Sequence, residues 1–258
     1  MKILVMRMLF MWLALIGCPA AGARDTPLTH VLFIGNSYLF YNDGLHNHVK
    51  RMATERFSAM RSSEFRYKSA TISGARLQHH NIDWLLMPEG IGVERPFQVV
   101  IMQGGSFEPL TDEGRESFIE TAVAYSHKVR QYGGQPMLYM TPAYVPPHVK
   151  AEDGMIDRII ETYLKAGEAA DATVIPVGLA FEKSYEERPD FSLHMSFDGT
   201  HPNLRGTFLG AYVVLLSLYG DVGDSLNYDY FGRLNADEVS YLQRIARAVV
   251  ADFRVREM

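Results

Sequence analysis

The segment THVLFIGNSYLFYND (residues 29–43) decides the fold and the site that the rest of the sequence can build. Its apolar run, residues 31–34, has the length and continuous hydrophobicity of a strand buried on both faces. The run stops at Gly35, Asn36 and Ser37, a small polar group typical of a tight turn. Ligands bind at the carboxyl ends of the strands of a parallel sheet, so Ser37 is the first candidate functional residue.

Apolar runs and segments with helical periodicity alternate along the whole sequence. Strands are predicted at residues 30–35, 64–72, 96–103, 135–142 and 173–178, and helices at 44–57, 111–133, 153–170, 203–220 and 235–253. Asp43 and Asn235 stand where the first and last of these helices need an N-cap. The alternation predicts an α/β fold with a central five-stranded parallel sheet that helices cover on both faces.

The composition is that of an ordinary globular protein. The sequence has 258 residues, of which 47% are hydrophobic and 21% charged, and its formal net charge is −5. No run of Lys and Arg is present, which argues against nucleic acid as a partner. The length suits one α/β domain, which we place at residues 24–258.

The N-terminal residues, 1–23, show the features of a secretory signal peptide in the usual order. Lys2 and Arg7 are followed by an apolar stretch too short to span a bilayer, and small residues precede a cleavage site after Ala23. We therefore expect a secreted or periplasmic protein. The residues before Cys18 also resemble a bacterial lipobox, so a lipid anchor on Cys18 is the alternative. Cys18 is the only cysteine, which excludes intramolecular disulfides and Cys-ligated zinc.

Ser37 needs a base before its hydroxyl can act as a nucleophile, and a histidine supplies one near neutral pH. The histidine needs a third group that fixes its tautomer and stabilises its charged form. Asp198 lies three positions before His201 in FDGTHPN (residues 197–203), and a turn of that length brings the carboxylate to the imidazole. Ser37, His201 and Asp198 are therefore predicted to form a catalytic triad.

An oxyanion formed by attack of Ser37 would need hydrogen-bond donors. The backbone N–H of Ser37 is one candidate, and Gly74, which follows the second strand, is another, with a plain turn glycine as its alternative. Gln103, after the third strand, is either a side-chain donor or a structural amide, and Ser106 is a weaker candidate. The remaining histidines lack a carboxylate at ligand spacing, so no metal site and no cofactor are expected.

Three blocks of the sequence resemble the SGNH (GDSL-type) hydrolases, in the branch whose first block reads G-N-S. They are FIGNSYLFYND (33–43), ISGARL (72–77) and FDGTHPNLRGTFLGAYVVLLSLYG (197–220). The resemblance implies a three-layer α/β/α sandwich of the flavodoxin-like type. It also implies that Ser37 is the nucleophile, that Gly74 is an oxyanion donor, and that Asp198 and His201 complete the triad. The family's third block carries an asparagine donor, whereas this chain has MQGGS (102–106).

The residues and the resemblance together predict a serine hydrolase that cleaves carboxylic esters, with a small-molecule or glycan ester as its partner. Exported relatives deacylate carbohydrates, so an acetylated carbohydrate is the expected substrate by resemblance. Two alternatives remain open on the same fold. One is an acyltransferase, in which a sugar hydroxyl replaces water. The other is a catalytically impaired glycan-binding module, which the missing third-block asparagine suggests.

Overall fold

The computed structural model describes residues 25–223 and 226–257 of the chain, and the predicted signal peptide and Cys18 lie outside them. One five-stranded sheet forms its centre, with the strand order β2-β1-β3-β4-β5. Every neighbouring pair of strands is parallel. The strands are β1 (His30–Gly35), β2 (Arg66–Thr71), β3 (Val99–Met102), β4 (Gln135–Tyr139) and β5 (Thr173–Ile175). This order is the flavodoxin-like one, so the predicted three-layer α/β/α fold is confirmed.

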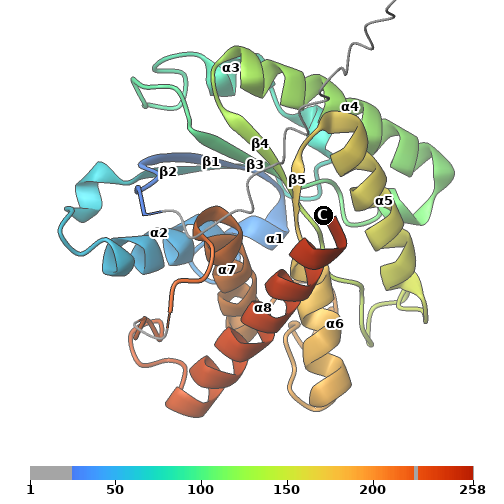
Figure 1. Ribbon diagram of the computed structural model, residues 1–258. Helices are drawn as coiled ribbons and strands as arrows, with labels where there is room; N and C mark the ends of the chain where they lie inside the picture. The colour runs from blue at the N-terminus through green and yellow to red at the C-terminus, as the bar shows by residue number, and fades with distance from the viewer. Residues whose placement is uncertain (1–24, 224–225, 258) are drawn as a thin grey trace, which may run out of the picture.

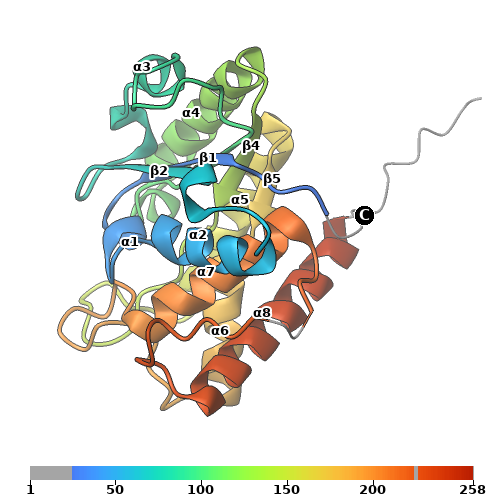
Figure 2. The ribbon, with the colours of Figure 1, turned by 90° about the vertical axis from the view of Figure 1, so that its left-hand side faces the viewer.

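Helices cover both faces of the sheet (Figures 1 and 2). One layer contains α2 (Leu45–Arg56), α6 (Val177–Glu187), α7 (Leu204–Tyr219) and α8 (Ala236–Glu257), and the other contains α3 (Ile82–Leu86), α4 (Asp112–Gln131) and α5 (Met155–Ala170). The side chains of β1 alternate between the two layers. Val31 and Phe33 pack on the first, and Leu32 and Ile34 on the second. A strand buried on both faces needs a continuous apolar run such as residues 31–34.

The helix α7 anchors the segment that precedes it. It packs between the sheet and α8 (Figure 2), so almost all of its residues are buried. Asn203 caps its first turn by accepting a hydrogen bond from the N–H of Gly206 at 3.1 Å. The Asn203 amide also donates to the carbonyl of Ser192 at 2.9 Å. The loop that carries Asp198 and His201 is therefore fixed to the start of a buried helix.

Two details differ from the sequence expectation. The fifth strand ends at Ile175, and Val177 begins α6, a helix that the sequence analysis did not predict. The N-cap of α2 is Gly44 and not Asp43, because Asp43 adopts a left-handed conformation with φ 74° and its carboxylate pairs with Arg51 at 2.7 Å. The predicted cap at Asn235 does form, since its side chain accepts from the N–H of Glu238 at 3.0 Å.

Candidate active site

Ser37 lies at the point of the sheet where the direction of strand connection reverses. It begins the short helix α1 (Ser37–Phe40) directly after β1, whose neighbours are β2 and β3. The chain leaves β1 towards β2 and returns past β1 to reach β3, so the loops after β1 and β3 diverge there. Such a switch point forms the binding crevice of an open α/β sheet. The turn after β1 therefore places the serine where a ligand can be reached.

The structure brings Ser37, His201 and Asp198 into one line. The Ser37 Oγ lies 2.8 Å from Nε2 of His201, although 164 residues separate them in the sequence. Nδ1 of His201 lies 2.6 Å from Oδ2 of Asp198. These are the contacts predicted from residue type and spacing. A hydroxyl, an imidazole and a carboxylate in this order can pass the serine proton to the imidazole while the carboxylate stabilises the resulting cation.

Asp198 is held as an anion by the loop around it. Burial raises the pKa of its carboxyl group, but hydrogen bonds from the backbone N–H of Thr200 and from His201 outweigh burial and bring the pKa below its ordinary value. Its Oδ1 accepts from the N–H groups of Thr200 at 2.9 Å and His201 at 3.1 Å, which leaves Oδ2 for the imidazole. A carboxylate at Nδ1 keeps the proton there, so Nε2 can accept from the Ser37 hydroxyl.

Gly35 and Asn36 shape the turn that presents Ser37. A Cβ at Gly35 would stand 2.5 Å from Oε1 of Gln103 and 2.7 Å from a methyl carbon of Leu39, so only glycine fits. The side-chain oxygen of Asn36 caps α1 by accepting from the N–H of Tyr38 at 3.2 Å. Its amide nitrogen donates to the carbonyl of Ala75 at 3.1 Å. Asn36 thus joins the turn that carries Ser37 to the loop after β2.

Of the two roles expected for Gln103, its contacts are those of a structural amide and not of an oxyanion donor. Its side chain is fully buried, and its Oε1 accepts from the backbone N–H of Asn36 at 3.0 Å. Its amide nitrogen donates to the carbonyl of the adjacent Gly104. The side chain turns inward because the buried N–H of Asn36 needs an acceptor there. Gln103 therefore stabilises the backbone of the turn that carries Ser37.

Two backbone N–H groups remain as donors. Within residues 25–223 and 226–257, neither the N–H of Ser37 nor that of Gly74 has a hydrogen-bond acceptor. Ser37 is the first residue of α1, where helical N–H groups lack an internal partner. Gly74 is exposed with φ +66°, and a Cβ there would meet nothing within 4 Å. The bond from Asn36 to the neighbouring Ala75 places Gly74 beside the nucleophile turn.

Aromatic side chains flank the imidazole of His201. Tyr41 stacks on His201 with ring centroids 4.5 Å apart, and Phe40 stacks on Tyr41 at 5.4 Å. Tyr38 is buried, and its hydroxyl is 2.7 Å from Oγ1 of Thr200. The tetrad YLFY (38–41) therefore divides between core and site, because α1 turns its successive residues to different sides.

His80 and His194, two histidines outside the proposed triad, are buried. His194 is 2% exposed, its Nδ1 lies 2.8 Å from the Tyr185 hydroxyl, and its backbone forms a β-bridge with Pro202. Burial lowers the pKa of His194 to about 4. His80 is 6% exposed beneath the turn after β1. Among the described residues, no group of His, Cys, Asp and Glu is arranged to hold a metal ion.

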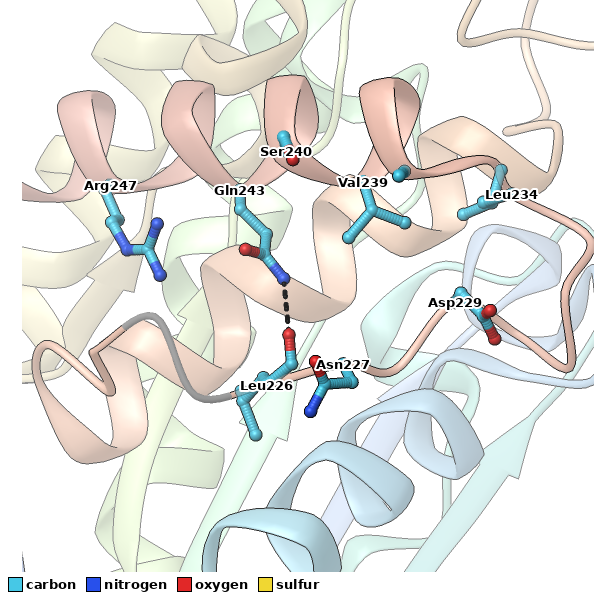
Figure 3. Close-up of a pocket in the computed structure, with 9 residues that line it drawn as sticks. Leu226, Asn227, Asp229, Leu234, Val239, Ser240, Gln243 and Arg247 are labelled. Carbon is cyan, nitrogen blue, oxygen red and sulfur yellow. Dashed lines mark hydrogen bonds between the residues drawn. The ribbon is translucent and has the colours of Figure 1, made fainter.

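A separate pocket of about 420 Å³ lies between α8 and the segment before it (Figure 3). Gln243 of α8 crosses its centre to bond the carbonyl of Leu226 at 3.3 Å. None of the residues in the predicted triad lines it. The structure therefore separates this hollow from the candidate active site.

Comparisons with known proteins agree on the fold. No family model and no curated protein matches this chain. A protein from Slackia heliotrinireducens assigned to the SGNH hydrolases matches 73% of this chain and 97% of its own, at 22% identity and a TM-score of 0.59. A DUF4886 family protein from Bacteroides uniformis matches 86% of this chain and 94% of its own, at 16% identity and a TM-score of 0.63. An acetyl xylan esterase matches 73% and 98%, at 18% identity and a TM-score of 0.56. The chain has the fold of the SGNH hydrolases.

Proposed function

We propose that this chain is a serine hydrolase of the SGNH superfamily that cleaves carboxylic esters. The single observation that carries the proposal is the unbroken line from the Ser37 hydroxyl to the Asp198 carboxylate, with His201 within 2.8 Å of one and 2.6 Å of the other. The line lies at the switch point of the sheet, beside two unpaired backbone N–H groups. A serine in a turn or a histidine in a loop has, taken alone, an ordinary structural explanation. Ser37, His201 and Asp198 in line beside two N–H donors are the arrangement that acyl transfer needs.

The proposed reaction has two halves. Ser37 Oγ attacks the acyl carbon as Nε2 of His201 takes its proton, and the N–H groups of Ser37 and Gly74 hold the oxyanion. The tetrahedral intermediate collapses, the C–O bond to the alcohol breaks, and His201 returns the proton to the leaving oxygen. Water then attacks the acyl-enzyme with His201 as base, which releases the acid and restores the Ser37 hydroxyl. Asp198 stays ionised and stabilises the imidazolium in both halves.

An acetylated carbohydrate is the substrate class we propose. One of the matched structures is an acetyl xylan esterase, which supports this class by fold alone. The exposed ring of Phe40 stacks on the half-buried ring of Tyr41 beside His201, and together they offer a flat surface of the kind that sugar rings pack against. The protein would act outside the cytoplasm after removal of residues 1–23. None of the described helices is long and apolar enough to cross a membrane.

Substitution of the nucleophile tests the proposal. Ser37→Ala should abolish hydrolysis of p-nitrophenyl acetate and labelling by a fluorophosphonate, because the nucleophilic oxygen is gone. The control is Ser240→Ala, which removes an exposed hydroxyl on α8 and should leave both signals unchanged. Residual activity of the Ser37 variant above a tenth of wild type would overturn the assignment.

The same labelling separates the alternatives. The inward-turned Gln103 leaves the third-block donor missing, which is the observation that favours a glycan-binding module. A wild-type protein that resists the fluorophosphonate yet binds an acetylated oligosaccharide saturably would establish that module. Transfer of the acyl group to an added sugar would establish an acyltransferase.

A further inference from the structure

Three consecutive residues after the nucleophile helix adopt left-handed backbone conformations. Asn42, Asp43 and Gly44 have φ values of 54°, 74° and 78°. Glycine takes such angles freely, but the two residues before it do so at a cost that the surrounding structure must offset. Strained backbone conformations cluster at functional sites, so the contacts that hold this segment in place are informative.

The side chain of Asn42 joins the two halves of the proposed triad. Its Nδ2 donates to the carbonyl of Pro202 at 2.9 Å and to Oγ1 of Thr207 at 2.8 Å. Pro202 directly follows His201, and Thr207 lies in α7, which the same loop enters. Both N–H bonds of this amide therefore reach from the segment after Ser37 to the segment after His201. The same two segments also meet where the Tyr38 hydroxyl reaches Oγ1 of Thr200, where the Tyr41 ring stacks on His201, and at the Ser37–His201 pair itself.

The backbone of Asn42 is fixed from the opposite side. The carbonyl can only accept, so the fully buried His48 donates to it through Nε2–H at 2.8 Å. The Nδ1 of that ring then accepts from the Tyr228 hydroxyl at 3.0 Å. Tyr230 stacks on the same imidazole with ring centroids 4.7 Å apart. A buried ring with both nitrogens bonded and one face covered gives Asn42 a rigid support.

We infer that Asn42 is a positioning residue, whose amide sets the distance between Ser37 Oγ and Nε2 of His201. The inference rests on the proposed function and extends it to a residue that touches neither substrate nor the reacting atoms. Only asparagine among the polar residues suits both demands of the position. It tolerates a left-handed backbone, and it carries two N–H donors on a short side chain.

The test compares two variants of Asn42 that differ in what they keep. Asn42→Gly retains the backbone conformation and loses the amide, and Asn42→Asp retains the size and loses both donors. Each should lower kcat for p-nitrophenyl acetate and the rate of fluorophosphonate labelling by about tenfold to a hundredfold, the cost of a misplacement on the order of 1 Å. KM should change little. The thermal midpoint should fall because two hydrogen bonds are lost, but a purely structural role would lower the midpoint alone and leave the labelling rate of the folded protein intact.

Asn47→Ala is the matched control. Asn47 also donates its amide to a backbone carbonyl, that of Asp43 at 2.7 Å, but it does not reach the His201 loop. Its removal should leave kcat and labelling at wild-type values. Wild-type kcat in Asn42→Gly would overturn the inference while leaving the proposed function intact. A wild-type protein that neither labels nor hydrolyses esters would overturn both.

Discussion

At the scale of single residues, Asp198 shows how one loop can fix the chemistry of a side chain. Three N–H donors converge on its two oxygens, from Thr200 and from the backbone and ring of His201. Together they hold the pKa of Asp198 below its ordinary value despite burial. The carboxylate therefore stays charged when the pH falls through the range in which free aspartate begins to protonate.

Asp198→Asn should separate geometry from charge. The amide fits the same space, but it does not stabilise an imidazolium or keep the proton on Nδ1, so kcat should fall by on the order of 10⁴-fold. The thermal midpoint should fall only slightly. The measurement is ester turnover at saturating substrate, with Asp190→Asn, an exposed position, as the control. Retention of more than about a tenth of wild-type kcat would contradict the role given to Asp198.

Residue types and spacing predicted the contacts among Ser37, His201 and Asp198, because a serine nucleophile needs a histidine beside it and that histidine needs a carboxylate. Ser37 follows a buried strand, and Asp198 stands three positions before His201 in one short loop. The direction in which a side chain points could not be predicted in the same way, since it depends on partners that other elements of the fold supply. Gln103 turned towards Asn36, and His194 became buried beside Tyr185, because tertiary packing placed those partners there.

At the scale of elements, the side chain of Asn203 has two structural roles at the start of α7. Asn203 caps the helix through its oxygen, and through its nitrogen it ties the preceding loop to the carbonyls of Ser192 and His194 at 2.9 and 3.2 Å. A Cβ at Gly206 in the same turn would stand 2.2 Å from the carbonyl oxygen of Leu193. The loop that carries His201 therefore packs closely against the helix that follows it.

Two substitutions at Asn203 divide these tasks. Asn203→Ala loses both and should reduce the free energy of unfolding by about 1–2 kcal/mol, with the cap as the main term. Asn203→Asp keeps the capping oxygen and loses the donor, so it should cost less stability but still slow turnover by loosening the loop. Urea unfolding and esterase assays on the same samples make the comparison. Equal losses of stability in the two variants would show that the cap is not the main term.

Long elements were predictable from the sequence, and short ones were not. Strands such as β1 and helices such as α4 display their periodicity over enough residues to be recognised. The helices α1 and α3 span four and five residues, too few for a 3.6-residue repeat to appear. The helix α6 begins two residues after β5 ends, with only Pro176 between, so its apolar start reads as a continuation of the strand.

At the scale of the whole molecule, buried histidines link stability to pH. Burial lowers the pKa of both His46 and His194 from 6.5 to about 4. In the unfolded chain these rings take up a proton near their ordinary pKa, whereas in the folded chain they remain neutral. Folding therefore gains its full contribution above about pH 6.5 and loses it progressively as the pH falls towards about 4.

His194→Gln tests this linkage. The wild-type protein should lose stability between pH 7 and 4.5, because the unfolded chain binds a proton at His194 and the folded chain does not. The variant should lose less, because glutamine binds no proton in either state. The difference should be on the order of 2–3 kcal/mol at most. Denaturant unfolding at both pH values measures it, with the exposed His127→Gln as the control. An identical pH response in His194→Gln and wild type would contradict the assignment.

The separation of 164 residues between Ser37 and His201 has a consequence for how activity arises during folding. A chain shortened just before Asp198 would contain every strand of the sheet and the serine turn, yet it would have no base. Catalysis by the proposed triad would thus report completion of the last steps of assembly, when α7 packs against α2 and the two distant loops meet. In a refolding experiment, ester turnover should appear no earlier than the slowest change in aromatic fluorescence.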